Sequence, residues 1–307
     1  MPPRSVAFLG PEGTFTSEAA ALAAPDARRE PLPAIPDVFA AVRQGRVDCG
    51  VVPIENLIEG SVNLTLDELA FGDDGVFISG ELVVPVSMSL LARPGTGLED
   101  VAQVSSHPHA LAQCRGWLEA KLPGAERVAA ASTAEAVRAI AEDGRVASAA
   151  IGTPSAAELY GLQVLANDIH DRAGNATRFV VLSRRLRPRS GADKTSLVVF
   201  FGEDRAGLLL RVLDELALRG INLSKIESRP MKTNLGEYCI LLDCEGHPAD
   251  ARLSEALRNI HRHVAGLKIL GAYQRADGRA VVAESAESDA SDAAARDWMP
   301  ELLSSLE

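Results

Sequence analysis

The sequence predicts an α/β protein of two domains, a two-lobed α/β domain followed by a small βαββαβ domain. Three observations support this prediction. With 307 residues, the chain is long enough for about two domains. Short apolar runs alternate with short helical patterns over residues 1–187, which is typical of parallel α/β sheets. A polar linker at residues 188–193, which contains Pro188 and Gly191, then leads into elements of a different order.

The composition excludes several classes of function. A formal net charge of −11 argues against nucleic acid or an acidic membrane as a partner. The four cysteines form no CxxC pair, which argues against a zinc ribbon or a disulfide framework and fits a reducing cytoplasm. The most apolar run, Leu82–Ala92, is too short to span a bilayer, and the N-terminus lacks the apolar stretch of a signal peptide. We therefore expect a cytoplasmic protein without a metal site.

The first lobe begins with an apolar strand and a glycine-rich loop that contains Thr14. We expect Thr16 or Ser17 to cap the helix after this loop, whose backbone N–H groups suit an anion. Glu55 and Asn56 then lie at the end of a second apolar strand, the position at which ligands bind in open α/β sheets. A turn or cap role for this pair is the competing interpretation. The remaining expected elements are strands at 6–9 and 49–52 and helices at 36–44 and 62–71.

The second lobe is expected to follow an extended stretch at residues 76–91. Ser106 lies at the end of the strand that begins at Val104, and Pro108 opens a helix that carries Gln113. The remaining expected elements are strands at 128–131, 147–151 and 163–166 and helices at 134–142 and 154–159.

Two histidines near this strand end invite a metal-site interpretation. His107 and His109 are two residues apart in a loop, without a carboxylate nearby in the sequence. A solvated or hydrogen-bonded pair therefore fits better than a metal site.

A polar loop at residues 167–176 enters the apolar run Val180–Leu182, which predicts a loop feeding a buried strand. This loop delivers a hydroxyl (Thr177), a cation (Arg178) and an aromatic ring (Phe179) to one strand end. The three groups suit an anionic substrate that must lose a polar group. The simpler interpretation is a turn with a strand-starting threonine and a surface arginine.

The second domain, residues 194–275, shows the order βαββαβ, a ferredoxin-like unit. The first expected helix of this domain carries an apolar face that includes Leu209, Val212 and Leu216. Residues 276–307 are rich in Ala, Ser, Asp and Glu, and we expect this acidic tail to be disordered. The other expected elements are strands at 194–201, 221–228, 237–244 and 267–273 and a helix at 249–264.

Seven motifs in order resemble a known family over roughly residues 4–275. The first domain resembles prephenate dehydratase through GPEGTFTSEAA, VPIENLIEG, SSHPHALAQC, AAIGTPSAAELYGL and NATRFVVLS. The second resembles an ACT domain through DRAGLLLRVL and GINLSKIESRP. Several ordered motifs on one chain are far more specific than any one of them.

The resemblance implies a periplasmic-binding-protein-like pair of lobes that converts prephenate to phenylpyruvate for phenylalanine biosynthesis. It implies no metal or organic cofactor. It also implies feedback control by phenylalanine through the ACT domain, and a homo-oligomer, a dimer or a tetramer, formed through ACT domains.

The resemblance carries functional residues over by position. Thr177, Glu55, Asn56, Ser106 and Gln113 correspond to the catalytic set, and Thr14, Arg178 and Phe179 to substrate-binding positions. The phenylalanine-binding positions are Gly207, Leu208, Leu209, Asn222, Leu223, Glu227, Ser228, Arg229 and Pro230. Three positions depart from the usual pattern: His109 replaces Gln, Leu57 replaces Ser or Thr, and Leu208 replaces Ala.

Two other functions remain open at this point. One is a non-catalytic small-molecule binding protein with an attached amino-acid sensor, against which the set Thr177, Asn56 and Gln113 argues. The other is the same reaction on arogenate, which carries an amino group in place of the keto group of prephenate.

Overall fold

The computed structural model describes residues 2–143, 147–172, 174–202, 205–234 and 236–277, together with Arg296, Trp298, Pro300, Leu303 and Ser304. The chain forms two compact units: residues 1–66 with 82–181, and residues 67–81 with 182–307. Segment 67–81, which the sequence assigned to the first domain, thus belongs to the second unit. Most of the acidic tail, for which we predicted disorder, lies outside the described residues.

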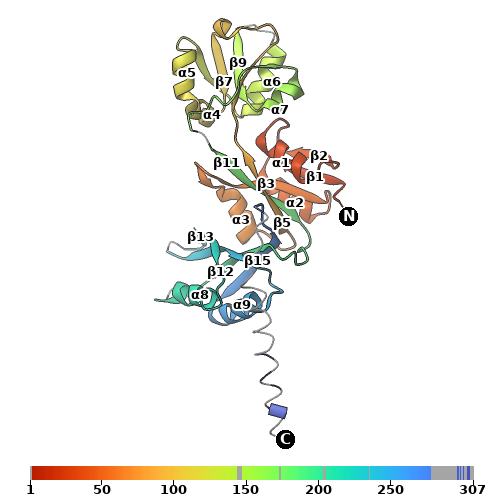
Figure 1. Ribbon diagram of the computed structural model, residues 1–307, viewed down its shortest axis with the longest axis vertical. Coiled ribbons are helices and arrows are strands. Elements are labelled where there is room, and N and C mark those ends of the chain that lie inside the picture. The colour runs from red at the N-terminus through yellow and green to blue at the C-terminus, as the bar shows by residue number, and fades with distance from the viewer. Residues whose placement is uncertain are drawn as a thin grey trace. The chain divides into compact units, whose positions relative to one another are not determined.

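The first lobe of the first unit is built on a sheet with the strand order β11-β3-β1-β2 (Figure 1). Strand β1 pairs in parallel with both β2 and β3. Helix α1 packs against this sheet through an apolar core that includes Phe8, Ala19, Val51 and Phe179. The elements are β1 (Ser5–Leu9), α1 (Phe15–Ala23), β2 (Arg28–Leu32), α2 (Ile35–Arg43), β3 (Cys49–Asn56), β4 (Gly60–Ser61) and β11 (Ala176–Ser183).

The predicted cap of helix α1 at Thr16 or Ser17 was wrong, because Thr14 is the N-cap. Its side-chain oxygen accepts a hydrogen bond from the Ser17 N–H at 3.2 Å and donates one to the Pro11 carbonyl at 3.0 Å. The helix therefore begins two or three residues earlier than expected. The Thr14 hydroxyl serves this turn both as a donor and as an acceptor.

The second lobe holds a five-stranded sheet of order β10-β6-β9-β7-β8. Strands β7, β8 and β9 are parallel, but β6 runs antiparallel to both β9 and β10. The expected parallel pairing therefore holds for β7, β8 and β9 but not at β6, through which the chain enters the lobe before it leaves through β10. The strands are β6 (Ser89–Ala92), β7 (Gln103–Ser106), β8 (Glu126–Ala129), β9 (Ser148–Gly152) and β10 (Gln163–Ala166).

Helices cover this sheet much as the sequence predicts. The helix expected after Pro108 is split in two at Cys114, whose backbone angles (φ −108°, ψ 12°) interrupt it. Thr153 caps the last helix, and Gly161 ends it in the left-handed conformation. The helices are η1 (Leu98–Asp100), α4 (Pro108–Gln113), α5 (Arg115–Lys121), α6 (Thr133–Asp143) and α7 (Pro154–Tyr160).

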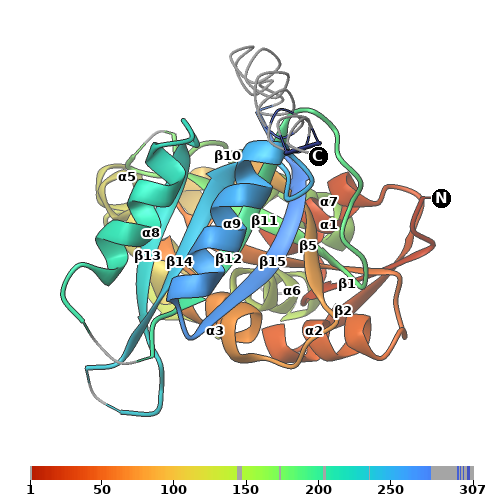
Figure 2. The ribbon, with the colours of Figure 1, turned by 90° about the horizontal axis from the view of Figure 1, so that it is seen from below.

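The second unit confirms the predicted βαββαβ order. Its antiparallel strands lie in the order β13-β14-β12-β15, and helices α8 and α9 lie side by side across one face of the sheet (Figure 2). Leu197, Val212, Leu216, Leu242 and Leu257 belong to the core between helices and sheet. The elements are β12 (Asp193–Phe200), α8 (Leu208–Ala217), β13 (Leu223–Pro230), β14 (Tyr238–Glu245), α9 (Ala251–His263) and β15 (Gly266–Gln274).

Segment 67–81 joins this unit through the end of α3 (Asn63–Phe71) and the start of β5 (Phe77–Pro85). Asp67 forms ion pairs with Arg229 at 2.6 Å and Lys232 at 2.7 Å. Ile78 of β5 pairs with Gly271, where any side chain would meet the Ile78 carbonyl oxygen at 2.2 Å. A glycine at this position is therefore required for the strands to approach.

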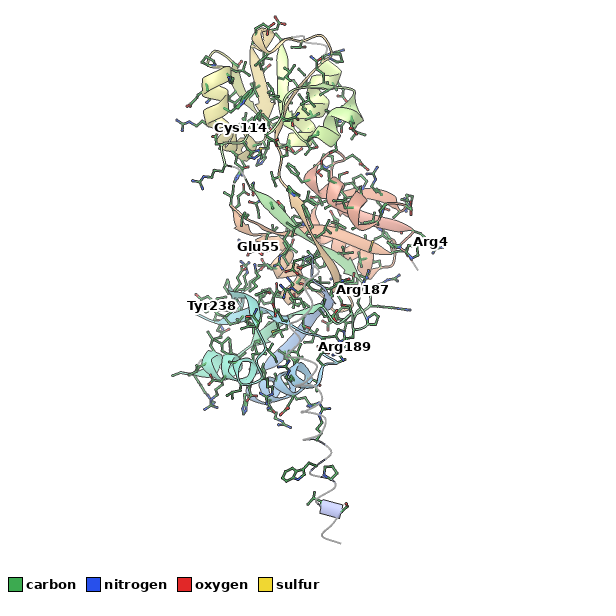
Figure 3. The ribbon with its side chains drawn as sticks, viewed as in Figure 1. Arg4, Glu55, Cys114, Arg187, Arg189 and Tyr238 are labelled. Carbon is green, nitrogen blue, oxygen red and sulfur yellow. The ribbon has the colours of Figure 1, made fainter. Side chains whose placement is uncertain are left out.

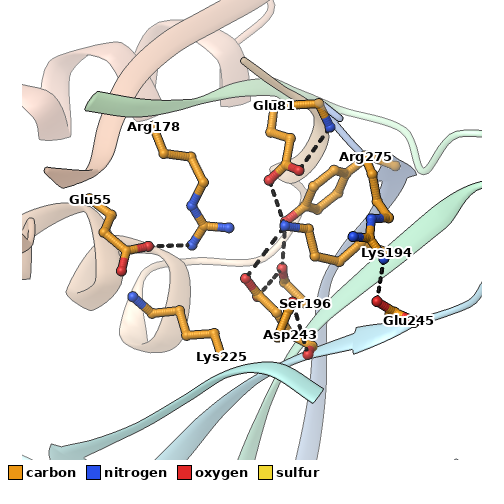
Figure 4. A network of polar contacts seen from close by, with 12 residues as sticks. Glu55, Glu81, Arg178, Lys194, Ser196, Lys225, Asp243, Glu245 and Arg275 are labelled. Atoms are coloured by element: carbon orange, nitrogen blue, oxygen red, sulfur yellow. Dashed lines mark hydrogen bonds and ion pairs between the residues drawn. The ribbon is translucent and has the colours of Figure 1, made fainter. Parts of the chain in front are cut away.

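A buried polar network further fixes this segment (Figure 4). Lys194 Nζ lies 2.8 Å from Glu81 and 4.0 Å from Asp243, and all three side chains are at most 10% exposed. Ser196 donates to Asp243 at 2.6 Å and lies 2.7 Å from the Tyr273 hydroxyl. Because unpaired buried charges are costly, the network favours one arrangement of β5 on the sheet.

Substitution of Asp67 tests the attachment of this segment. Burial by itself raises the pKa of Asp67, but hydrogen bonds from Lys232 and Arg229 outweigh it and hold the pKa below 3.8. A depressed folded-state pKa contributes stability that is present above the unfolded value and is lost as the pH falls through the folded value. Asp67→Asn should therefore lower the free energy of unfolding by about 2 kcal/mol at both pH 7 and pH 5.

Urea unfolding followed by circular dichroism measures this change. The matched control is Asp74→Asn, because Asp74 is 93% exposed in its ion pair with Lys268 and should contribute less than about 0.5 kcal/mol. Equal stability of the Asp67 and Asp74 variants would contradict the structural role of the Asp67 contacts.

Candidate active site

Strands β3 and β11 lie side by side and place four predicted site residues on two opposite faces. On one face, Asn56 Nδ2 donates a hydrogen bond to Thr177 Oγ1 at 2.9 Å. On the other, Arg178 Nη2 forms an ion pair with Glu55 at 3.0 Å (Figure 4). Successive side chains of a strand point to opposite faces, so neighbours in sequence cannot all serve one site.

The orientation of the Asn56 amide is fixed by its surroundings. Its Oδ1 accepts hydrogen bonds from the backbone N–H groups of Ile58 at 3.0 Å and Glu59 at 3.1 Å. The NH₂ group must then face Thr177 and donate to its oxygen. Because that bond uses an acceptor position of Thr177 Oγ1, the threonine keeps its own hydrogen for another acceptor.

A cavity of about 450 Å³ lies between the two lobes of the first unit. Glu59 reaches it from the loop after β3, and Gln113 donates to Glu59 at 3.1 Å from α4 on the second lobe. The lining residues are Ile58, Glu59, Pro108, His109, Ala112, Gln113, His170, Asp171, Arg172 and Asn175.

The two histidines are hydrogen-bonded, as predicted, although a carboxylate does lie beside one of them. His109 Nδ1 lies 2.9 Å from Glu59 Oε1, so a carboxylate that is distant in sequence does accompany it. The rings of His107 and His109 stack with centroids 5.3 Å apart. Among the residues that the structure describes, no group of three or more potential metal ligands exists.

Of the eight predicted catalytic and substrate-binding residues, Gln113 alone lines this cavity, and the side chains of three others are committed elsewhere. Ser106 is fully buried and donates its hydroxyl to the Ile151 carbonyl at 2.9 Å, which satisfies the hydroxyl within its own sheet. Phe179 is 1% exposed and packs in the core beside Phe8, because it follows Thr177 by two residues into the sheet interior. The Thr14 hydroxyl caps α1. A direct contact of these side chains with substrate is thus not supported.

Burial also excludes the Cys114 thiol as a nucleophile. Cys114, labelled in Figure 3, lies at the break between α4 and α5, and all four cysteines are buried and free. Burial, together with the charge of Asp171, raises the pKa of the Cys114 thiol to about 12. The thiolate form is therefore negligible at neutral pH. Asp171 itself accepts hydrogen bonds from the backbone N–H groups of Gly116 at 2.9 Å and Trp117 at 3.1 Å.

The sequence missed three residues of the cavity wall, Glu59, His170 and Asn175. Glu59 follows the Glu55–Asn56 pair by a few residues, and Asn175 precedes Thr177 by two. Side chains two residues apart on a strand share a face, so the sequence could have placed Asn175 on the same face as Thr177. The contact of Glu59 with His109 joins positions 50 residues apart and had no local signal.

The predicted phenylalanine-binding residues separate into several places in the second unit. A cavity of about 580 Å³ at the start of α8 is lined by Gly207, Leu208, Leu209 and Ser228, among others. Asn222 lines a different cavity of about 60 Å³ and donates to Glu245 at 3.1 Å.

The other predicted members of this set lie outside the larger cavity. Glu227 pairs with Lys225 at 3.0 Å and Arg229 with Asp67, because alternation along β13 turns both away from Ser228. Leu223 packs against the core under the helices, and Pro230 is exposed. The structure therefore does not bring the nine residues together around one cavity.

Comparison with known proteins agrees with this architecture. A family model described as prephenate dehydratase matches residues 6–187, and one described as ACT domain matches residues 195–262. A prephenate dehydratase of Amycolatopsis methanolica is 42% identical over 299 residues, covering 96% of each chain.

Within the described residues, no helix is long and apolar enough to cross a membrane.

Two solved structures are similar over most of their length. Prephenate dehydratase from Arthrobacter aurescens, solved in complex with L-Phe, matches with a TM-score of 0.88 and 43% identity, covering 98% of this chain and 99% of that one. GqqA, described as a quorum quenching acylase, matches with a TM-score of 0.82 and 32% identity, covering 90% and 100%. The predicted family resemblance and fold class are confirmed.

Proposed function

The chain belongs to the prephenate dehydratase family, and we propose that it converts prephenate to phenylpyruvate through the site at Asn56 and Thr177. In this reaction the electron pair of the bond to the ring carboxylate moves into the ring as carbon dioxide leaves. The ring then expels its hydroxyl, which takes up a proton and departs as water. The ring becomes aromatic, so the reaction runs downhill and consumes no external oxidant or reductant.

The observation that supports this proposal is the hydrogen bond from Asn56 Nδ2 to Thr177 Oγ1. It leaves the Thr177 hydrogen free to bond to the departing hydroxyl, where negative charge develops. A fixed donor aimed at developing charge stabilises a transition state by about 3 kcal/mol. Because the amide donates to Thr177, it also polarises the hydroxyl toward stronger donation.

The other predicted residues receive roles from their positions. Gln113 and Glu59 come from different lobes, line the 450 Å³ cavity and are hydrogen-bonded to one another, so we propose that they position the lobes around substrate. We assign Glu55 and Arg178 to bracing β3 against β11 from the opposite face. Four free, buried cysteines support a cytoplasmic location.

We further propose that phenylalanine regulates the enzyme from the 580 Å³ cavity of the second unit. The cavity combines apolar side chains of α8 with the backbone at Gly207, whose left-handed conformation (φ 85°) begins the helix. The Arthrobacter aurescens relative was solved in complex with L-Phe, which supports phenylalanine as the effector. The nearby side chains of Leu210, Ile226 and Tyr238 are 61%, 53% and 51% exposed, which supports pairing of ACT domains in a homo-oligomer.

Thr177→Val tests the proposed catalytic role. The substitution keeps the shape of the side chain and removes the donor, so kcat for prephenate should fall by about two to three powers of ten. Thr177→Ser, which restores the hydroxyl, should recover most of the rate. The matched control is Thr65→Val, because the Thr65 hydroxyl donates to the Pro53 carbonyl at 2.6 Å, outside the cavity. Near-normal turnover of a folded Thr177→Val enzyme would show that Thr177 is not the donor.

Ser228→Trp tests the proposed regulatory site. Ser228 is exposed on β13 and lines the 580 Å³ cavity, so an indole there should fill the cavity and raise the phenylalanine concentration for half-inhibition by about tenfold or more. Ser224→Trp is the control, since Ser224 is exposed on the same face of β13 but does not line the cavity. Inhibition curves and calorimetric titration measure the effect. Unchanged phenylalanine binding in Ser228→Trp would place the effector elsewhere.

A further inference from the structure

Two side chains that line the 450 Å³ cavity keep a buried polar atom without a hydrogen-bond partner in the described part of the chain. They are His170, through Nδ1, and Asn175, through Oδ1. Asn175 is only 6% exposed. A buried polar atom without a partner is destabilising, and native proteins contain few of them. Two such atoms on one cavity wall indicate that a bound ligand supplies their partners.

The backbone around both residues is held in place. Asp171 donates its N–H to the Gln113 carbonyl at 2.7 Å, directly after His170. The Asn175 carbonyl accepts from the Val86 N–H at 2.8 Å. The backbone from which the two side chains extend is therefore fixed before any ligand enters, which lowers the entropic cost of orienting a substrate.

Asn175 also has a defined relation to the proposed donor. It precedes Thr177 by two residues, directly before β11 begins. Residues two apart on an extended chain point to the same side, so Asn175 lies on the side of the sheet that carries Thr177 and Asn56.

The two carboxylates of the cavity wall have partners of their own. Glu59 binds His109 and Gln113, and Asp171 accepts from two backbone N–H groups at the start of α5. The groups left for a ligand are hydrogen-bonding side chains and the cation of Arg172, which suits a molecule with negative charge.

This inference rests on the proposed function, because it uses the chemistry of prephenate. The substrate carries two carboxylates, which only accept hydrogen bonds, and one hydroxyl, which both donates and accepts. We propose that Asn175 Oδ1 accepts the hydrogen bond of the departing hydroxyl and that His170 Nδ1 donates to a substrate carboxylate. Asn175 thereby orients the hydroxyl so that its oxygen receives the hydrogen bond from Thr177.

Asn175→Leu and His170→Leu, made in the full-length chain, test the proposal. Each should lower kcat/KM for prephenate by about 10- to 100-fold. Each should also leave the thermal unfolding midpoint unchanged or raise it, because the variant no longer buries an unpaired polar atom. A merely structural residue would show the reverse, a lower midpoint with little change in kcat/KM.

Two further variants serve as matched controls. Asn167→Leu removes an amide outside the cavity whose Oδ1 already accepts from Ser89 Oγ at 3.0 Å, so it should keep kcat/KM within about twofold. His170→Asn places an amide nitrogen near the position of Nδ1 and should restore most of the activity lost in His170→Leu.

The outcomes separate this inference from the proposed function. Unchanged kcat/KM in both leucine variants, with an active unmodified enzyme, would overturn the inference alone. Absence of prephenate turnover in the unmodified enzyme would overturn the proposed function. If Asn175→Leu does not fold, Asn175→Asp decides, because its added charge beside a dianion should raise KM at least about tenfold, and an unchanged KM would overturn the role of Asn175.

Discussion

The alternation of side chains along β3 and β11 is the constraint on which the candidate site depends. Two adjacent residues on each strand form two cross-strand pairs, Asn56 with Thr177 and Glu55 with Arg178, on opposite faces of one sheet. In the mechanism that we propose, the neutral pair leaves a hydroxyl hydrogen free for the departing group. The charged pair has its charges matched to one another, so it holds the strands together without competing for substrate. The same backbone contact thus supports both the chemistry and its scaffold.

Alternation along a strand also separates adjacent side chains in the second unit. Ser228 and Arg229 are adjacent on β13, yet one lines the 580 Å³ cavity and the other is paired with Asp67 of α3. Segment 67–81 is fixed to this sheet by the Asp67 contacts, by the Ile78–Gly271 strand pairing and by the buried Lys194–Glu81 pair. An effector in the cavity would therefore contact Ser228, the neighbour of Arg229, which binds Asp67. Segment 67–81, to which Asp67 belongs, is continuous in sequence with the first unit.

Local sequence patterns predicted most of the elements, the fold class and the residues of the Asn56–Thr177 pair. They did not predict how deeply each side chain is buried in the folded core, and for this reason Ser106 and Phe179 were assigned to the site although both are buried. Contacts between distant positions were also invisible to local patterns. Arg229 and Asp67, for example, are 162 residues apart in the sequence. Segment 67–81 belongs to the second unit, although the sequence assigned it to the first domain. Glu59, His170 and Asn175 were missed because the cavity that unites them forms only when both lobes are folded.

The most direct test of the account is a double-mutant cycle on kcat with Asn56→Ala, Thr177→Val and the combined variant. If the Asn56 amide acts by directing and polarising the Thr177 hydroxyl, the two side chains work as one unit and their effects are not additive. The combined variant should then be no slower than Thr177→Val alone, within about twofold. Effects that multiply in the combined variant would show that Asn56 and Thr177 act independently, and would contradict a site organised around their hydrogen bond.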